Sequence, residues 1–363
     1  MDALSAFMSL IVLGVGALVL AYCARYFREH EPKDAVFGGQ LLAFAGAMFG
    51  LVTTDDLMVL YTFWEITSVL SFLLIGYAGQ RIFARRSAIQ ALIVTTFGGL
   101  AMLVGLLMLG VQAGSWKVSG VLAAAPELLA DPALRGYAEW AVALVLIGAL
   151  TKSAQIPFHF WLPAAMAAPT PVSAYLHAAA MVKAGVFLVA RLAPEFAGLM
   201  SWQVLVIGVG LATLLVGGYR ALRQTDIKLV LAYGTVSQLG FLMVANGFGT
   251  RDAAMAGLAM LIAHTLFKAP LFMVVGIIDH ETGTRDVRTL SGIGRSHPML
   301  AGMSAVAAAS MAGMPPLFGF VAKESVLEAA QHTAEHHGTV WAWSPLVFLS
   351  LGSVLTVAYT CRF

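Results

Sequence analysis

Apolar stretches recur along the chain, and short polar segments separate them. A helical stretch of about 20 apolar residues crosses the ~30 Å hydrocarbon layer of a bilayer. The pattern predicts eleven spanning units: Leu4–Tyr22, Ala35–Val52, Leu57–Tyr77, Ala88–Leu109, Ala138–Pro157, Val172–Ala190, Met200–Tyr219, Ile227–Ala245, Ala253–Ile278, Pro298–Ala330 and Pro345–Thr360. We predict an all-α polytopic membrane protein with a single transmembrane domain over residues 1–363 and a surface helix in the loop 111–137.

Composition agrees with a lipid environment. The chain is 60% hydrophobic and 11% charged, whereas soluble domains carry about 25% charged residues. A net charge of +2 gives no basis for a nucleic-acid partner. Cys23 and Cys361 lie far apart, without a disulfide framework or a haem-attachment motif, and we expect no cofactor.

Lysine and arginine residues are sorted between alternate loops. One set of loops holds 13 of them, namely Arg25, Arg28, Lys33, Arg81, Arg85, Arg86, Arg220, Arg223, Lys228, Arg285, Arg288, Arg295 and Arg362. The other set holds 4, namely Lys117, Arg135, Arg191 and Arg251. Because cytoplasmic loops are enriched in basic residues, we predict a protein of the inner (plasma) membrane that starts outside and ends in the cytoplasm. Since Leu4–Tyr22 lacks the features of a cleavable signal, we expect N-terminal helices to be missing from this chain.

Two units are predicted to be discontinuous. In the fifth, Lys152 is followed by Pro157, and in the tenth Pro315 and Pro316 precede Lys323. Proline removes a backbone donor and clashes with the preceding turn, so broken helices inside a membrane are tolerated where they line a hydrated cavity. A kink that serves only packing is the alternative.

The spacing of the two breaks also suggests a duplication. Lys152 lies on the fourth of units two to six, and Lys323 on the fourth of units seven to eleven. Because five is an odd number of helices, consecutive copies must be inverted in the membrane. We predict two inverted five-helix repeats, at residues 35–190 and 200–363.

Ionisable residues inside apolar spans are costly and typically functional. Glu65 lies eight residues into its unit, ~12 Å along a helix and near mid-depth. Lys152 is its expected partner on charge grounds, and His264 and Lys268, four residues apart, share a helix face. We predict a proton relay along the membrane midplane and call its members the charged row: Glu65, Lys152, His177, Lys183, His264, Lys268 and Lys323.

Lysine suits such a relay because its proton affinity responds strongly to burial and to a neighbouring carboxylate. Three alternatives stay open. Glu65 and Lys152 could form a purely structural ion pair, and the histidines at positions 177 and 264 could be core residues with satisfied hydrogen bonds. The protein could also be a membrane scaffold in which the charges only align the helices with one another. Haem ligation by the two histidines is disfavoured by the adjoining lysines.

Other chemistry is weakly indicated. A possible metal-binding spacing occurs in a predicted solvated outer loop, at His332, Glu335, His336 and His337. The chain contains no HExxH, P-loop, dinucleotide or GxSxG motif, so an intramembrane enzyme is the weakest alternative and no metal is expected.

Five segments carry a family resemblance: LTKSAQIPFHFWLPAAMAAPTPVSAYLHAAAMVKAG at 150–185, FWE at 63–65, QTDIKLVLAYGTVSQ at 224–238, HTLFKAPLF at 264–272 and GFVAKE at 319–324. They resemble the antiporter-like subunits shared by respiratory complex I and the Mrp-type multisubunit Na⁺/H⁺ antiporters. Lys183, TFWEITS at 62–68 and IDHETGTRD at 278–286 are similar to the Mrp large subunit in particular.

This resemblance implies that Glu65 and Lys152 form a switching ion pair, that His177, Lys183, His264 and Lys268 are a central relay, and that Lys323 with Glu324 is the terminal site. It implies a secondary-transport subunit, not an enzyme, which exchanges protons for Na⁺ beside other membrane subunits. The alternative is a proton-pumping subunit of complex I, an NADH:quinone oxidoreductase. It also implies a fourteen-helix core, of which the chain would begin near the third helix and end near the thirteenth.

Overall fold

The computed structural model describes residues 2–27, 32–337 and 339–363. Arg28, counted above among the basic loop residues, and the side chains of Lys33 and His337 lie outside the described residues. The described part is helical throughout, and its β-type pairing is limited to two isolated bridges, Asp56 with Lys117 and Asp226 with Asp286.

The α-helices are α1 (Ala3–Tyr26), α2 (Pro32–Thr53), α3 (Leu57–Ile75), α4 (Ile82–Ala113), α5 (Val118–Ala130), α6 (Pro132–Lys152), α7 (Trp161–Ala164), α8 (Thr170–Leu176), α9 (Lys183–Phe196), α10 (Met200–Trp202), α11 (Val209–Leu222), α12 (Ile227–Gly247), α13 (Arg251–Thr282), α14 (Ile293–Ser296), α15 (Pro298–Ala312), α16 (Phe318–His337) and α17 (Ser344–Thr360). The 3₁₀ turns are η1 (Gly76–Ala78), η2 (Phe158–Phe160), η3 (Ala165–Ala167) and η5 (Val340–Trp343), and η4 (Gln203–Gly208) is a π-helical segment.

Nine helical spans in the described residues are long and apolar enough to cross a membrane. Each of the other two predicted units is divided between two helices, α8 with α9 and α15 with α16. Helix α5 confirms the predicted surface helix. The count of eleven crossings and the inverted repeats stay predictions.

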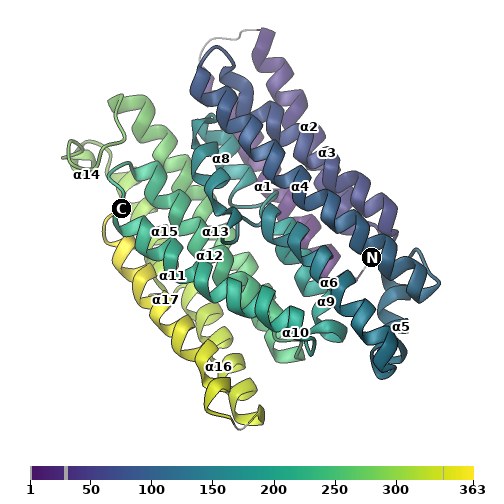
Figure 1. Cartoon of the computed structure of the whole chain (residues 1–363). Coiled ribbons are helices and arrows are strands. Elements are labelled where there is room, and N and C mark those ends of the chain that lie inside the picture. The colour runs from purple at the N-terminus through teal and green to yellow at the C-terminus, as the bar shows by residue number, and fades with distance from the viewer. Residues whose placement is uncertain (1, 28–31, 338) are drawn as a thin grey trace.

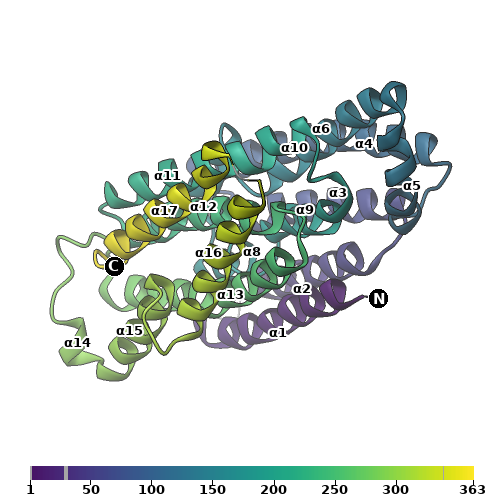
Figure 2. The same cartoon turned by 90° about the horizontal axis from the view of Figure 1, so that it is seen from below.

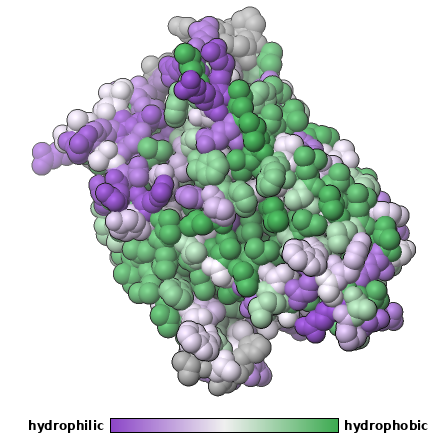
Figure 3. Space-filling view, viewed as in Figure 1, coloured by the Kyte–Doolittle hydropathy of each residue, from purple (hydrophilic) through white to green (hydrophobic). Residues whose placement is uncertain are grey.

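The long helices lie roughly side by side in an elongated bundle (Figure 1). The N-terminal end lies near α5, and the C-terminus lies at the opposite end, as Figure 2 shows from a second direction. On the surface, a broad hydrophobic region separates two hydrophilic ends (Figure 3). This distribution is typical of a bundle that crosses a bilayer along its long axis.

Helix α12 forms the centre of the second half of the bundle, and 89% of the residues in its most apolar 18-residue stretch are buried. It packs on α11 at backbone distance, because a Cβ placed on Gly240 would lie 2.5 Å from the carbonyl oxygen of Gly210. Asp226 begins α12, since its carboxylate accepts hydrogen bonds from the amides of Lys228 and Leu229. Backbone contact between helices without intervening side chains is typical of membrane bundles.

Both predicted breaks are confirmed. Helix α6 ends at Lys152, and after Ala154 (φ 49°) and Pro157 the chain continues in short helical turns. Helix α15 ends at Gly313, whose φ of 84° closes the helix in a left-handed conformation. Helix α16 starts beyond Pro315 and Pro316.

A third break was not predicted. The sixth unit was placed as one span from 172 to 190, but it consists of α8 and α9 with the segment 177–182 between them. His177 therefore caps the end of α8 and Lys183 opens α9, so the two do not share one helix as expected. The prediction of a loop at 332–337 is also wrong, because these residues form the end of α16.

Candidate functional site

Lys152 is the last residue of α6, and its side chain is fully buried. Its ammonium nitrogen donates to the Trp64 carbonyl oxygen and to the Ser68 hydroxyl of α3, each at 2.8 Å. It also lies 5.1 Å from the centre of the Trp64 ring, which suits a cation–π contact. The break after α6 thus presents an ammonium group to a polar patch on α3.

Glu65 follows Trp64 on α3 and points toward α4. A Cβ placed on Gly99 would lie 1.9 Å from the Glu65 Oε1 atom, so glycine makes room for the carboxylate. This buried oxygen has no hydrogen-bond partner in the described part of the protein. Glu65 lies near enough to Lys152 for their charges to interact, but no direct ion pair joins them among the described residues. The expected partners are neighbours, and Lys152 donates to other groups.

Lys183 connects the start of α9 to the middle of α13. Its fully buried ammonium donates to the Leu261 carbonyl oxygen at 2.9 Å and to the Thr265 hydroxyl. His264, next to Thr265, lies close enough to both Lys183 and Lys268 for their charges to act on its ring. The structure therefore brings together three of the predicted residues, one from α9 and two from α13.

Lys268 lies one turn further along α13, where it faces α12 and α17. Its ammonium donates to the Leu231 carbonyl oxygen at 3.2 Å and lies 5.8 Å from the centre of the Tyr359 ring. The amide of Gln238 donates to the Thr356 hydroxyl at 2.9 Å in the same region. Polar groups thus continue from Lys268 into the second half of the bundle.

His177 lies fully buried between the rings of Trp161 and Phe272, with centroids 6.2 and 6.5 Å away. Neither of its ring nitrogens has a hydrogen-bond partner within the described protein. His177 is therefore buried, and within the described protein no group satisfies its ring nitrogens as the core-histidine alternative expects; its relay role stays a prediction. Buried polar atoms without partners are uncommon and often mark functional sites.

Lys323 and Glu324 diverge, although they are adjacent in sequence. The Lys323 ammonium donates to the carbonyl oxygens of Met311 and Ala312, at 2.8 and 3.1 Å, at the end of α15. Glu324 is exposed on the outside of α16. A charge on Lys323 there complements the negative end of the α15 dipole. The two residues expected to form one terminal site therefore face different surroundings.

The segments that carry Lys152 and Lys183 are linked by a hydrogen bond to the backbone. The Ser153 hydroxyl, next to Lys152, donates to the carbonyl oxygen of Val182 at 2.7 Å, and Val182 precedes Lys183. The break after α6 therefore lies against the break before α9. Every buried member of the charged row lies on or beside a helix break or on a helix packed against one.

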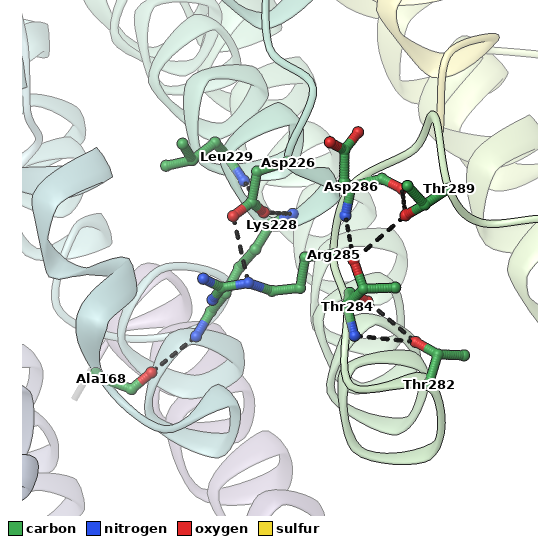
Figure 4. Close-up of polar contacts among 9 residues, drawn as sticks. All are labelled: Ala168, Asp226, Lys228, Leu229, Thr282, Thr284, Arg285, Asp286 and Thr289. Carbon is green, nitrogen blue, oxygen red and sulfur yellow. Dashed lines mark hydrogen bonds and ion pairs between the residues drawn. The ribbon is translucent and has the colours of Figure 1, made fainter.

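Sequence reasoning missed Lys228, which it assigned to a cytoplasmic loop. The side chain is 2% exposed, and its ammonium donates to the Ala168 carbonyl oxygen at 2.7 Å (Figure 4). It lies close enough to His177 for its charge to act on the imidazole. The available signal was its position, since Lys228 is the second residue of a predicted span.

Metal chemistry finds no support in the described residues, where no group of three or more His, Cys, Asp or Glu side chains could hold an ion. His332, Glu335 and His336 line a small surface depression at the end of α16 and do not form such a group.

Long apolar helices, interrupted at buried lysines, define a polytopic membrane protein. Residues 54–357 match the family described as "NADH:quinone oxidoreductase/Mrp antiporter, TM", and the chain belongs to this family.

Two curated relatives extend the comparison. A Rhizobium meliloti (strain 1021) protein, named as the probable A/B subunit of a K(+)/H(+) antiporter, is 46% identical over 365 residues, which cover 100% of this chain and 36% of the relative. An Alkalihalophilus pseudofirmus protein, named as the A subunit of a Na(+)/H(+) antiporter, is 44% identical over 379 residues, which cover 96% of this chain and 46% of the relative. The chain thus spans less than half the length of these relatives. The resemblance to the Mrp-type large subunit is confirmed.

Solved structures of two membrane complexes contain chains with the same fold. A chain in the "Structure of Mrp complex from Dietzia sp. DQ12-45-1b" superposes with a TM-score of 0.93 at 42% identity, covering 100% of this chain and 39% of that chain. A chain of an archaeal membrane-bound sulfane sulfur reductase superposes with a TM-score of 0.86 at 24% identity, covering 98% of this chain and 72% of that chain. The second match concerns the fold alone.

Proposed function

We propose that this chain is the proton-translocating transmembrane part of a multisubunit monovalent cation/proton antiporter. The observation that carries the proposal is the central group, in which the fully buried Lys183 and Lys268 both lie close enough to the buried His264 for their charges to act on it. Several buried ionisable side chains in one region are costly for stability, so a function that uses their protons is the better explanation. Family membership supports the same conclusion.

In this proposal the charged row works in sequence. Glu65 modulates the proton affinity of Lys152, the contact between Ser153 and Val182 couples that group to Lys183, and His264 passes protons between Lys183 and Lys268. Lys323, at the second break, is the terminal group. The scaffold alternative assigns these residues no transport role.

We further propose that the exchanged cation is Na⁺ and that other membrane subunits complete the antiporter. One relative is named for K⁺ and another for Na⁺ at similar identity, so cation selectivity is a separate measurement. The end that carries Arg81 and Arg285 would face the cytoplasm, because basic loop residues gather there. The inverted repeats 35–190 and 200–363 belong to the same proposal.

The test uses the full-length protein in its assembled complex, in everted membrane vesicles. Lys152→Ala and Glu65→Ala should abolish cation-driven dissipation of a preset ΔpH, while the exposed loop variant Lys117→Gln should retain it. Normal assembly with unchanged antiport in both charge variants would refute the proposal. Proton movement that follows NADH oxidation and is insensitive to Na⁺ and K⁺ would favour the complex I alternative.

A further inference from the structure

A polar pocket of about 690 Å³ opens at the end of the bundle where the turn between α11 and α12 meets the loop after α13. Its charged lining residues come from three separate parts of the chain: Arg81, Asp226, Lys228, Asp279 and Arg285. Four of them, all except Lys228, also line an adjoining depression of about 580 Å³. We call the larger cavity the Lys228 pocket.

Lys228 forms the inner wall of this pocket. Its side chain is almost wholly buried, and its ammonium donates to the carbonyl oxygen of Ala168, between η3 and α8. Helix α8 then leads directly to His177, on which the charge of Lys228 acts. Lys228 therefore lies between an open polar pocket and the first buried histidine of the charged row, and the proposed relay gives it no role.

The side chain of Arg285 crosses that of Lys228 in the view of Figure 4, and its charge acts on Lys228. Its Nε atom pairs with an Asp226 carboxylate oxygen at 3.2 Å. The backbone fixes the loop in place, because the Ile227 amide donates to the Arg285 carbonyl and the Val287 amide to the Thr225 carbonyl, both at 2.9 Å. This contact fastens the loop after α13 to the first residue of α12.

The charges around Lys228 oppose one another. Asp226 and Asp279 favour a positive charge on Lys228, while Arg285 disfavours it. Arg81 also lines the pocket, the charge of Lys228 acts on His177 at the end of α8, and among the described residues the phenol groups of Tyr26 and Tyr77 are the other titratable groups that line the pocket. Burial is the largest influence against a charge on Lys228 and Arg285 adds to it, so the position of this guanidinium changes how strongly the surroundings oppose protonation of Lys228.

We propose that Arg285, held by Asp226, is a gate at the mouth of the proton route, and that Lys228 exchanges protons between this pocket and His177. The inference rests on the proposed function and adds the place where protons reach the charged row. With Arg285 in place, its charge opposes a proton on Lys228; when Arg285 swings away, the two carboxylates remain and protonation becomes easier. The loop after α13 then controls access to the relay.

The experiment measures cation-driven antiport against pH in vesicles that hold the full-length protein in its complex. Arg285→Gln should shift the pH profile toward higher pH by about half a unit, because removal of a nearby positive charge makes protonation of Lys228 easier. Arg285→Lys keeps the charge and should restore most of the original profile. Lys228→Met should lower transport at least tenfold.

Arg288→Gln is the matched control. Arg288 lies three residues away on the same loop, is exposed, and pairs with Asp286 at 2.6 Å instead of facing Lys228. Its variant should keep the original pH profile. Identical profiles for Arg285→Gln and Arg288→Gln, in vesicles where Lys152→Ala abolishes antiport, would overturn the gate and leave the relay standing. Unchanged antiport in Lys152→Ala would overturn the proposed function itself. Should Lys228→Met fail to assemble, the two arginine variants decide the question.

Discussion

The two predicted helix breaks each carry a lysine, but they use it differently. Lys152 reaches across to another helix, where it contacts a carbonyl and a hydroxyl of α3 beside Glu65. Lys323 turns back to its own break and covers the last carbonyls of α15. The first lysine is therefore coupled to an acidic neighbour, whereas the second stabilises the end of a helix. One sequence pattern, a broken helix with a lysine, thus supports two physical roles.

The largest expected effect separates these roles directly. Lys152→Met should lower antiport at least tenfold with little loss of stability. Lys323→Met should also lower the free energy of unfolding, by about 1–3 kcal/mol, because it leaves buried carbonyl groups without donors. Antiport in vesicles and thermal unfolding of the purified complex measure the two effects. Equal destabilisation by both variants would remove the distinction.

Ser68 offers a sharper test of the first break. Ser68→Ala removes the hydroxyl that accepts from Lys152, so we expect a several-fold loss of antiport and an altered pH profile. Ser71→Ala is the control, since Ser71 is equally buried and, among the residues that the structure describes, its hydroxyl donates only to the Ser68 carbonyl. If the two alanine variants behave alike in the vesicle assay, the hydroxyl contact to Lys152 has no part in transport.

The backbone of the second break gives a smaller effect. Gly313→Ala forces an alanine into a left-handed conformation at φ 84° and places a Cβ 3.1 Å from the Lys323 side chain. We expect a loss of about 1–2 kcal/mol in unfolding free energy. Gly302→Ala, inside α15 with open space around its Cβ position, is the control and should be neutral or slightly stabilising. Thermal unfolding of the complex distinguishes the two variants.

The smallest effect concerns the acidic neighbours. Glu65 lies beside Lys152, so Glu65→Gln should lose most of the antiport activity. Glu324 is exposed, so Glu324→Gln should retain more than half of it. Both substitutions keep the size of the side chain and remove only its charge. A severe loss in Glu324→Gln would show that the second break also depends on its acid.

Much of this architecture follows from local sequence. Apolar length determines where a helix crosses the bilayer, and Pro157 and Pro316 mark breaks because proline lacks an amide donor. Proline alone is not sufficient, since Pro270 lies inside the continuous helix α13. The membrane spans and two of the helix breaks could therefore be predicted from the sequence.

The remaining features depend on tertiary contacts. The break before Lys183 falls in an alanine-rich segment that favours helix locally, and it coincides with contacts from Lys183 to Leu261 and Thr265 on another helix. The burial of Lys228 depends on Ala168, 60 residues away in sequence. Sequence could name Glu65 and Lys152 as partners by charge, but it could not show that Lys152 donates to Trp64 and Ser68 instead. The roles of the charged row stay predictions.

The glycine contact between α11 and α12 has a mechanical consequence. Where the backbones of Gly210 and Gly240 touch, neither helix can slide past the other without a collision between main-chain atoms. This glycine pair therefore holds α11 and α12 in a fixed relative position. Only side chains and the interrupted segments around the pair are free to rearrange. Conformational change in such a bundle would be confined to side chains and interrupted segments, along a frame that stays rigid.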